Sequence, residues 1–256
     1  MINTIKGNIY RSIFSIIWIF KNYMNLKKII SKDFNYKIIK LFRIQDWHFG
    51  QRYFYVSNEV DTYFMKSLGH GENNLNEIKV LNLFNNKYIY FPLFINCFSY
   101  KSEKMVVMEK LNLERLDEFL KKNYLNLEET KKIISSFIEI CDIFSKEKIV
   151  HRDIRPQNIF INRTEVITIK VIDFAYAISL NKGFLNEVKI SEVKKGFFKN
   201  LGGEYRYDHL QWDDAYSFLK ISENIYSGKE LFLLEEYQQL KKKIGKTKYI
   251  LEEKIE

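Results

Sequence analysis

The chain has little of what cross-links or interrupts a fold, because its 256 residues include only two cysteines, two prolines and ten glycines. Cys97 and Cys141 lie far apart with no CxxC spacing, which argues against a disulfide scaffold or zinc module and favours a reducing compartment. The scarcity of proline and glycine excludes collagen-like and low-complexity chains. Apolar residues at 46% and aromatic residues at 16% exclude general disorder and are sufficient for a sizeable core.

Acidic residues are fewer than basic ones, 32 against 41, and the formal net charge is +9. Such a surface attracts polyanions, which include nucleotides, nucleic acid, anionic lipid and phosphorylated glycan. Solvated lysines that only keep the protein soluble explain the same charge. The sequence contains no recognisable motif for reading nucleic acid, so we expect no nucleic-acid partner.

No apolar run is long enough to span a bilayer, and the longest near the N-terminus, Ser12–Phe20, is followed by lysines rather than by a small-residue cleavage site. Residues 1–35 are therefore interpreted as a basic amphipathic segment. Apolar residues recur there at helical spacing: Ile9, Ile13, Ile16, Ile17 and Phe20. One interpretation places this helix on an anionic membrane face. The other packs the stripe onto the domain and is favoured, because surface helices usually turn such stripes to the core.

The rest of the chain divides at about residue 111 into a strand-rich part, 36–111, and a helical part, 112–256. Alternating segments predict strands at Lys37–Arg43, Gln51–Val56, Thr62–Ser67, Tyr88–Tyr100 and Lys104–Met108. One helix is expected over Asn73–Phe84. Later segments predict helices at Leu113–Lys122 and Leu127–Lys146, strands at Ile159–Ile161 and Thr168–Ile172, and helix from about Asp213 to the end. This order of elements indicates an α+β fold.

The chemistry is concentrated in two segments. Val150–Asn162, VHRDIRPQNIFIN, has the spacing H-R-D-x-x-P-x-N, and Ile169–Ala177, IKVIDFAYA, places Asp-Phe-Ala after an apolar strand. Fixed positions at this spacing are a strong signal, whereas most short motifs are weak. The two segments resemble the catalytic loop and metal-binding segment of the protein-kinase-like superfamily. The resemblance implies a bilobal fold with an antiparallel-sheet N-lobe containing one helix and a reduced helical C-lobe.

The resemblance also implies roles for the residues of these segments in phosphoryl transfer, which depends on positioning and charge neutralisation. Asp153 would accept the proton of the attacking hydroxyl. Asn158 and Asp173 would supply the oxygen ligands that Mg²⁺ prefers. Arg155 would hold the γ-phosphate of ATP as a planar fork.

Further residues follow from the same family pattern. Lys66 at the end of the strand segment Tyr63–Lys66 would contact the α- and β-phosphates, and Glu77 on the following helix would pair with it. Lys79 and Glu72 are the alternatives for these two positions. The backbone of Glu109 to Leu111 falls at the hinge, where it would bind the edges of adenine.

Three residues downstream complete the expected site. In WDDAYSF, Asp214 matches the family aspartate that braces the backbone of the HRD turn. Asp213 is well placed to cap the helix that follows. Arg206, in LGGEYRY, could meet an anionic acceptor, and a surface arginine is the equal alternative.

The sequence departs from the family pattern at several positions. The turn at Asp46–Gln51 contains only Gly50, so the glycine-rich phosphate loop is missing. Phe64 stands where the family keeps a small residue over adenine, and Ala175 replaces the glycine of DFG. No APE motif is present, and the later helices are expected to be reduced.

The sequence therefore predicts an ATP- and Mg²⁺-dependent kinase that transfers phosphate to an alcohol. The short chain and the HRDIRP form are most similar to bacterial lipopolysaccharide-core kinases acting on Kdo or heptose. That similarity implies a sugar hydroxyl of a cell-envelope glycolipid as acceptor, and a cytoplasmic protein with peripheral contact at the inner face of the membrane. A Ser/Thr protein kinase and a catalytically weak pseudokinase or scaffold are the alternatives. Asp153, Asn158 and Asp173 are all present, which favours activity.

Overall fold

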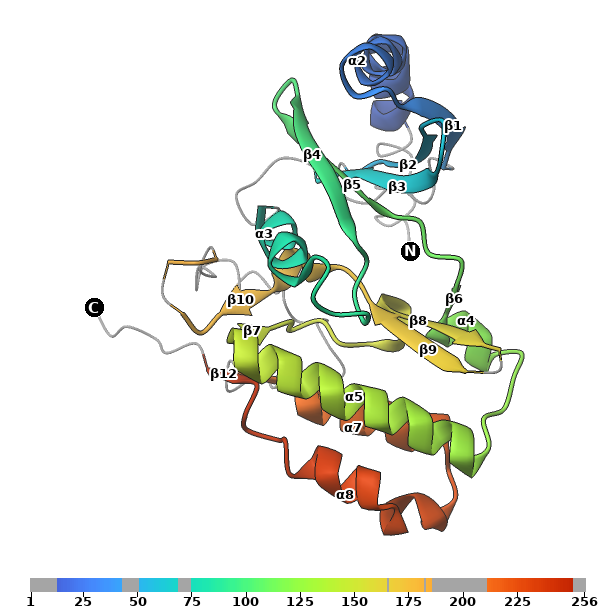
Figure 1. Ribbon diagram of the computed structural model, residues 1–256, viewed down its shortest axis with the longest axis vertical. Coiled ribbons are helices and arrows are strands. Elements are labelled where there is room, and N and C mark those ends of the chain that lie inside the picture. The colour runs from blue at the N-terminus through green and yellow to red at the C-terminus, as the bar shows by residue number, and fades with distance from the viewer. Residues whose placement is uncertain are drawn as a thin grey trace. The chain divides into compact units, whose positions relative to one another are not determined.

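Two units make up the protein in this computed structural model, which describes residues 13–42, 51–68, 75–164, 166–181, 183–185 and 211–250. The sheet unit comprises Met1–Ile78 with Pro92–Leu111, and the helical unit comprises Lys79–Phe91 with Asn112–Glu256. The boundary between the units falls inside helix α3 (Leu75–Phe84). The predicted α+β class is confirmed, since antiparallel strands dominate the first unit and helices the second (Figure 1).

The sheet unit contains five strands in the order β1-β2-β3-β5-β4, and each pair is antiparallel. Their bounds are β1 Lys37–Leu41, β2 Tyr53–Ser57, β3 Thr62–Ser67, β4 Phe94–Tyr100 and β5 Glu103–Glu109. The central strands β3 and β5 pair in an unbroken register from Tyr63 opposite Glu109 to Ser67 opposite Met105. Met65, Met105 and Val107 are buried on this pair, which places the core of the unit against one face of the sheet.

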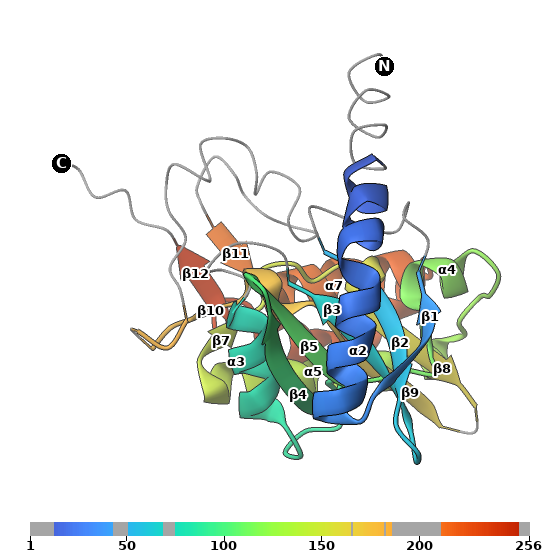
Figure 2. The same cartoon turned by 90° about the horizontal axis from the view of Figure 1, so that it is seen from above.

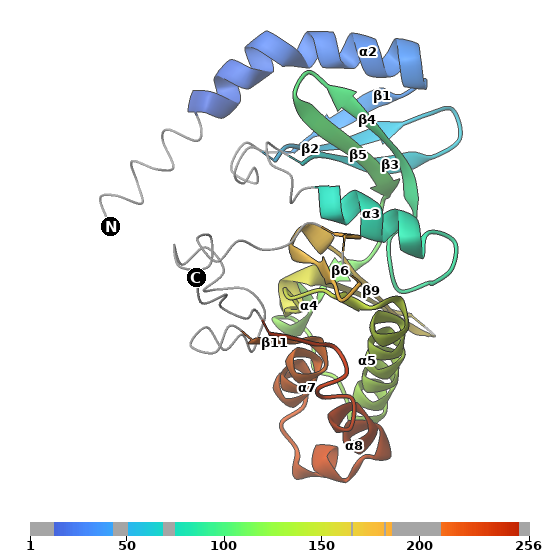
Figure 3. The same cartoon turned by 90° about the vertical axis from the view of Figure 1, so that its left-hand side faces the viewer.

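A long N-terminal helix covers that core. Residues 13–34 are helical, and they include a π-helical stretch, η1 (Ile19–Tyr23), followed by α2 (Met24–Phe34). α2 lies along the strands of the sheet unit in both views (Figure 2, Figure 3). Trp18, Leu26 and Ile30 are buried in the same cluster as the strand residues Phe54 and Val56. The helix therefore packs on the sheet, as the favoured interpretation expected.

The packing face is different from the predicted one. Four residues of the predicted stripe are exposed: Ile13, Ile16, Ile17 and Phe20. Ile9 lies outside the described residues. The helix carries apolar side chains on two faces, and the line of Trp18, Leu26 and Ile30 is the one that meets the sheet.

Two helices pack against the longest one, α5, in the helical unit (Figure 1). The helices are α4 Leu116–Leu120, α5 Leu127–Glu147, α7 Asp214–Ile225 and α8 Glu235–Lys241. The strands are β6 Glu114–Arg115, β7 Ile149–Val150, β8 Ile159–Arg163, β9 Ile167–Val171, β10 Ile178–Ser179, β11 Gln211–Asp213 and β12 Lys248–Ile250, and the 3₁₀ turns are Pro156–Asn158, Phe174–Tyr176 and Lys229–Leu233. Asn126 caps α5 in a capping box with Glu129, so the helix begins where the sequence predicts.

Three predicted elements are wrong in part. The strand expected over Tyr88–Tyr100 begins only at Phe94, because the preceding residues form turns. The helix expected over Leu113–Lys122 is shortened to α4, because Glu114 and Arg115 pair with β8 as β6. Helix does not continue to the end, because α8 stops at Lys241 and β12 pairs with β11. Among the described residues, no helix has the length and apolarity needed to cross a membrane.

Candidate active site

The loop after β7 and the turn Pro156–Asn158 that follows it hold the central pair of the site, Asp153 and Asn158. Both side chains are buried, and the Asn158 side-chain amide donates to the backbone oxygen of Asp153 at 2.9 Å and to its carboxylate Oδ2 at 2.8 Å. Pro156 occupies the first position of the turn, where its fixed φ favours the turn geometry. The amide hydrogens of Asn158 both face Asp153, so its oxygen Oδ1 is the atom that can serve a cation.

Arg155 places a positive charge beside this pair. Its Nη2 lies 3.4 Å from Oδ2 of Asp153, and its side chain is 40% exposed. A guanidinium in this position can approach an anion from solvent while it stays next to the carboxylate. The structure thus brings together the three residues that the sequence predicts as catalytic.

His151 connects the loop to the second motif. The backbone N–H of Asp153 lies 3.2 Å from Nδ1, so Nδ1 accepts, and Nε2 carries the proton that it donates to the backbone oxygen of Ile172 at 3.0 Å. Burial lowers the pKa of His151 to about 4, which keeps the ring neutral at pH 7 and fits this tautomer. The buried ring of His151 therefore fixes the backbone of Ile172, the residue before Asp173, relative to the backbone of Asp153.

Asp173 follows β9 in a left-handed backbone conformation, with φ of 69°. The backbone N–H of Ile172 donates to the backbone oxygen of Asn158 at 3.0 Å, so the two predicted magnesium ligands lie on neighbouring backbone segments. The next residue, Phe174, is fully buried among the rings of Phe91 and Phe144. Packing of this ring holds the start of the turn in place.

The donor chemistry at this point fits Mg²⁺. The described residues contain no cluster of three or more His, Cys, Asp or Glu side chains that could hold a metal. Mg²⁺ does not need one, because it usually binds one or two carboxylates and completes its shell with water and phosphate oxygens. The carboxylate of Asp173 and Oδ1 of Asn158 supply that kind of set.

Asp214 braces the loop from the N-terminus of α7. Its Oδ2 accepts from the backbone N–H of His151 at 2.6 Å, and its Oδ1 accepts from that of Arg152 at 3.0 Å. Burial raises the pKa of Asp214 to about 7, against the opposing effect of the two N–H donors. The contact that the resemblance implies is therefore confirmed. Asp213 is confirmed as the cap of α7, because it accepts from the backbone N–H of Tyr216 at 3.2 Å.

The sheet unit carries a buried ion pair between Lys66 of β3 and Glu77 of α3. Nζ of Lys66 lies 2.6 Å from Oε2 of Glu77, and the side chains are 7% and 2% exposed. The predicted pairing is confirmed. The alternative lysine, Lys79, donates instead to the backbone oxygen of Phe184 at 3.0 Å. Glu72 lies outside the described residues.

Comparison with known proteins agrees with this geometry. The profile of the protein kinase domain family matches residues 49–193, which is more than half of the chain and includes Lys66, Asp153 and Asp173. The chain belongs to the protein kinase domain family. The kinase-like fold that the sequence motifs implied is thereby confirmed.

Two curated relatives of this kinase-domain chain are similar over shorter segments. The probable serine/threonine-protein kinase PknB of Lactococcus lactis is 29% identical over 89 residues, which is 34% of this chain and 14% of the relative. The carbon catabolite-derepressing protein kinase of Candida glabrata is 26% identical over 83 residues, which is 32% of this chain and 13% of the relative. The matched segments thus span about one seventh of each relative's length. Both relatives carry names of protein kinases.

The predicted hinge of the kinase domain, Glu109 to Leu111, begins at a residue that is hydrogen-bonded to Leu93. The backbone N–H of Glu109 donates to the backbone oxygen of Leu93 at 2.9 Å, and its Oε2 accepts from the backbone N–H of Leu93 at 3.1 Å. Leu111 is partly exposed. The adenine-binding role of these residues stays a prediction. Gly50 and Arg206 lie outside the described residues.

Phe64 packs in an aromatic cluster on the sheet. Its ring centroid lies 5.9 Å from those of Phe42 and Tyr53, and the ring is stacked on Tyr53. The bulky residue that replaces the family's small one is thus part of a cluster of neighbouring rings, which explains how the sheet accommodates it.

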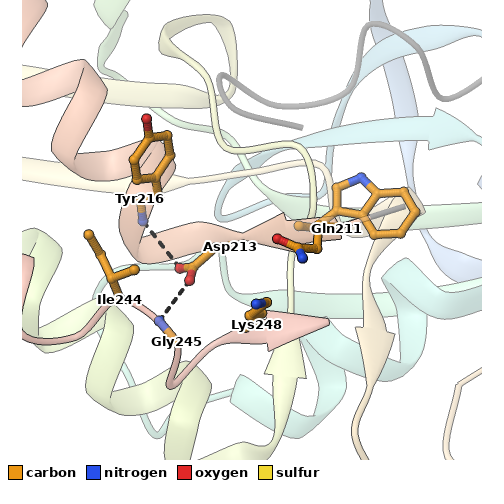
Figure 4. Close-up of a pocket in the computed structure, with 7 residues that line it drawn as sticks. Gln211, Asp213, Tyr216, Ile244, Gly245 and Lys248 are labelled. Carbon is orange, nitrogen blue, oxygen red and sulfur yellow. Dashed lines mark hydrogen bonds between the residues drawn. The ribbon is translucent and has the colours of Figure 1, made fainter. Parts of the chain in front are cut away.

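A shallow pocket of about 260 Å³ opens beside the first turn of α7 (Figure 4). It is lined by Gln211, Trp212, Asp213, Tyr216, Ile244, Gly245 and Lys248. Asp213 lies between Tyr216 and Gly245, and its carboxylate accepts from the backbone N–H of both, as the dashed lines show. This volume is below the range of about 300–1,000 Å³ that is usual for ligand sites, and we assign no ligand to it.

The sequence motifs give no role to Arg152, which the structure shows to be a structural member of the site. Its backbone is left-handed, with φ of 68°, and its Nε donates to the backbone oxygen of Tyr176 at 2.6 Å. The guanidinium lies 5.0 Å from the centre of the Trp212 ring. These partners are distant in sequence, so no local pattern could have indicated them.

Proposed function

We propose that the protein is an ATP-dependent phosphotransferase that phosphorylates an alcohol hydroxyl with the help of Mg²⁺. The observation that carries the proposal is the Asp153–Asn158 pair, in which the amide of Asn158 donates one hydrogen bond to the buried carboxylate of Asp153 and one to its backbone oxygen. His151 and Asp214 fix the backbone of the same loop. Preorganisation of this kind is what phosphoryl transfer requires of a protein.

Each site residue has a proposed task. Asp153 accepts the proton of the attacking hydroxyl, and Arg155 binds the γ-phosphate. Oδ1 of Asn158 and the carboxylate of Asp173 hold Mg²⁺, which when bound neutralises charge on the phosphates. The ATP-binding residues proposed in the sheet unit are Lys66, Glu77, Glu109 and Leu111.

The acceptor that the comparisons favour is a serine or threonine of a protein, because the family and the names of both relatives refer to protein kinases. The second candidate is the predicted sugar hydroxyl of a cell-envelope glycolipid, in a protein held at the inner face of the membrane. The apolar and lysine-rich outer surface of the N-terminal helix supports it, because such a surface suits contact with lipid.

The deciding experiment measures transfer of label from γ-labelled ATP with Mg²⁺ into protein and glycolipid fractions of a cell extract. Asp153→Asn is the matched variant, because asparagine keeps the shape and can still accept from Asn158. Glu230→Gln, at an exposed position of the same unit, is the control that should retain full activity.

Label in protein that disappears with Asp153→Asn supports the serine/threonine kinase, and label in glycolipid that disappears supports the sugar kinase. We expect the variant to lose at least a hundredfold in rate, which is within the usual contribution of a general base. Absence of label from both fractions, or full activity of Asp153→Asn, would refute the proposal and leave a pseudokinase or scaffold.

A further inference from the structure

The N-terminal helix has a second apolar face that the fold does not use. Its inner face is formed by Trp18, Asn22, Leu26 and Ile30, which follow one another at intervals of four residues and are all buried. The other side, here called the outer face, carries exposed apolar side chains: Ile13, Ile16, Ile17, Phe20 and Met24. Phe14, four residues before Trp18, continues the inner line and does not belong to this face. A helix that only packed on the sheet would carry polar residues there.

The exposure of the outer face is large. Phe20 is 84% exposed, Met24 70% and Ile13 47%. Exposed apolar side chains scattered singly are ordinary on a soluble protein, but five of them within about three turns of one helix form a contiguous patch. Patches of this kind mark surfaces that contact another molecule or a membrane.

Lysines accompany the outer face. Lys21, Lys27, Lys28 and Lys32 are all exposed, and the only acidic residue of the described helix is Asp33. The described helix, residues 13–34, therefore has a net charge of +3, from four lysines and one aspartate. At about 100° per residue along α2, Lys27 and Lys28 lie within about 60° of Met24 and therefore on the same side of the helix. The patch thus combines apolar contact area with positive charge.

The inner face fixes the helix to the sheet. Nε1 of Trp18 donates to Oε1 of Glu103 at 3.3 Å, and the guanidinium of Arg52 lies 4.2 Å from the centre of the Trp18 ring. Further along, Nζ of Lys101 donates to Oδ1 of Asn22 at 2.6 Å. These contacts of the inner face hold the helix against the sheet, and the helix lies over the strands in Figure 3.

We propose that the outer face docks onto an anionic lipid surface, with its apolar side chains in the interface and its lysines on the headgroups. The charge decides between possible partners, because an apolar patch for a protein partner does not need lysines along its length, whereas an interfacial helix uses both. The helix lies on the bilayer and does not cross it. The proposal uses no catalytic residue and does not depend on the proposed function.

The test is sedimentation of the whole protein with two kinds of vesicle. One contains phosphatidylcholine alone, and the other contains phosphatidylcholine with ~30% phosphatidylglycerol, which mimics an anionic membrane. We expect strong binding only to the anionic vesicles, with affinity that falls as salt is raised. The triple variant Lys21→Gln, Lys27→Gln, Lys28→Gln should lose on the order of a hundredfold in affinity, since each lysine near such a surface contributes about fivefold.

Two matched control variants distinguish vesicle binding by the outer face from binding that depends only on net charge or on general hydrophobicity. The triple variant Lys229→Gln, Lys242→Gln, Lys246→Gln removes the same charge from exposed positions elsewhere and should bind almost normally. Phe20→Gln with Met24→Gln should weaken binding at least tenfold, because these side chains are no longer buried in the interface. Val60→Gln with Leu233→Gln, which changes residues 84% and 85% exposed, should not.

Several results would overturn the proposal. Equal loss with both lysine triples would show attraction by net charge alone, and normal binding of the double variant Phe20→Gln, Met24→Gln would show that the outer face is not inserted. A homodimer in light scattering that Phe20→Gln dissociates would assign the face to a second copy. Urea unfolding confirms that each variant is folded, and Asp153→Asn should bind vesicles normally, which separates docking from catalysis.

Discussion

At the residue scale, Asp213 and Asp214 are sequence neighbours that hold different parts of the helical unit. Asp213 caps α7 at the surface, whereas Asp214 is fully buried beneath the catalytic loop. Asp214→Ala leaves the backbone N–H groups of His151 and Arg152 without their acceptor. We expect a loss of about 2–5 kcal/mol in the free energy of unfolding, since each unsatisfied buried donor costs about 1–3 kcal/mol.

Asp213→Ala is the matched control and should cost about 2 kcal/mol at most, because water can replace the carboxylate at the partly exposed N–H groups of Tyr216 and Gly245. Urea denaturation of both variants measures the difference. Equal costs would show that Asp214 is not the brace of the loop.

His151 and Asp214 should give opposite pH signatures. The unfolded chain protonates histidine near pH 6.5 but the native ring only at about 4, so stability from His151 rises with pH across this window and is complete above it. The native Asp214 carboxyl titrates at about 7 instead of near 3.8, so its contribution is greatest below pH 3.8 and is lost as pH rises through 7. The two effects largely cancel in the wild-type protein.

Variants reveal each contribution separately. The cost of His151→Asn should be greatest at neutral pH and shrink by about 3 kcal/mol as pH falls to 4, at 1.36 kcal/mol per pKa unit. The cost of Asp214→Asn should instead shrink by about 4 kcal/mol as pH rises from 4 to 7. Urea unfolding at several pH values measures both, and slopes of the same sign would contradict the assignment.

At the element scale, β3 and α3 are joined through the buried pair of Lys66 and Glu77. Lys66→Met removes the cation that lies 2.6 Å from the buried Glu77 carboxylate, and the expected loss in the free energy of unfolding is about 3–5 kcal/mol. The double variant Lys66→Met, Glu77→Leu should recover most of that loss, because it removes the buried charge as well. Chemical denaturation of the two variants tests this, and additive losses would show that the pair is not coupled.

The elements also show what the sequence can and cannot reveal. β3 was predicted at its exact bounds from its local residue pattern. The start of α5 was predicted to the residue, and Asn126 defines it locally as the N-cap. The turns at residues 88–93 were missed, because they depend on distant contacts such as Tyr90 with Glu139. The end of α8 was missed for the same reason, since β12 forms only by pairing with β11.

The site shows the same contrast between local and distant signals. Asp153, Asn158 and Asp173 could be placed from motif spacing, since they lie in two short segments of fixed pattern. The bridging role of His151 and the partners of Arg152 could not be predicted from spacing. Their side-chain hydrogen bonds run to the distant residues Ile172 and Tyr176. Sequence spacing therefore identifies the reactive groups, and the packing that orients them becomes visible only in the structure.

At the scale of the whole molecule, binding of Mg²⁺ and ATP should stabilise the native chain against heat. A ligand at a hundred times its dissociation constant contributes about 2.7 kcal/mol, and this corresponds to roughly 5–10 °C in Tm for a chain of this size. Differential scanning fluorimetry with and without MgATP measures the shift. Asp173→Ala should unfold at the same temperature in both conditions, and an undiminished shift would argue against Asp173 as a ligand of the metal.

The π-helical turn at Ile19–Tyr23 sets the rotational phase of the described turn before it, Ile13–Trp18. Its wider turn advances less than the ~100° per residue of an α-helix, which brings Trp18 back towards the line of Leu26 and Ile30. With α-helical winding throughout, the eight steps from Trp18 to Leu26 would advance by about 800° and leave Trp18 about 80° from that line. Loss of one residue within the turn would leave seven steps of a regular α-helix, about 700°, and Trp18 would still face the sheet. The helix therefore tolerates an extra residue at this point without a change in the side that it shows to its surroundings.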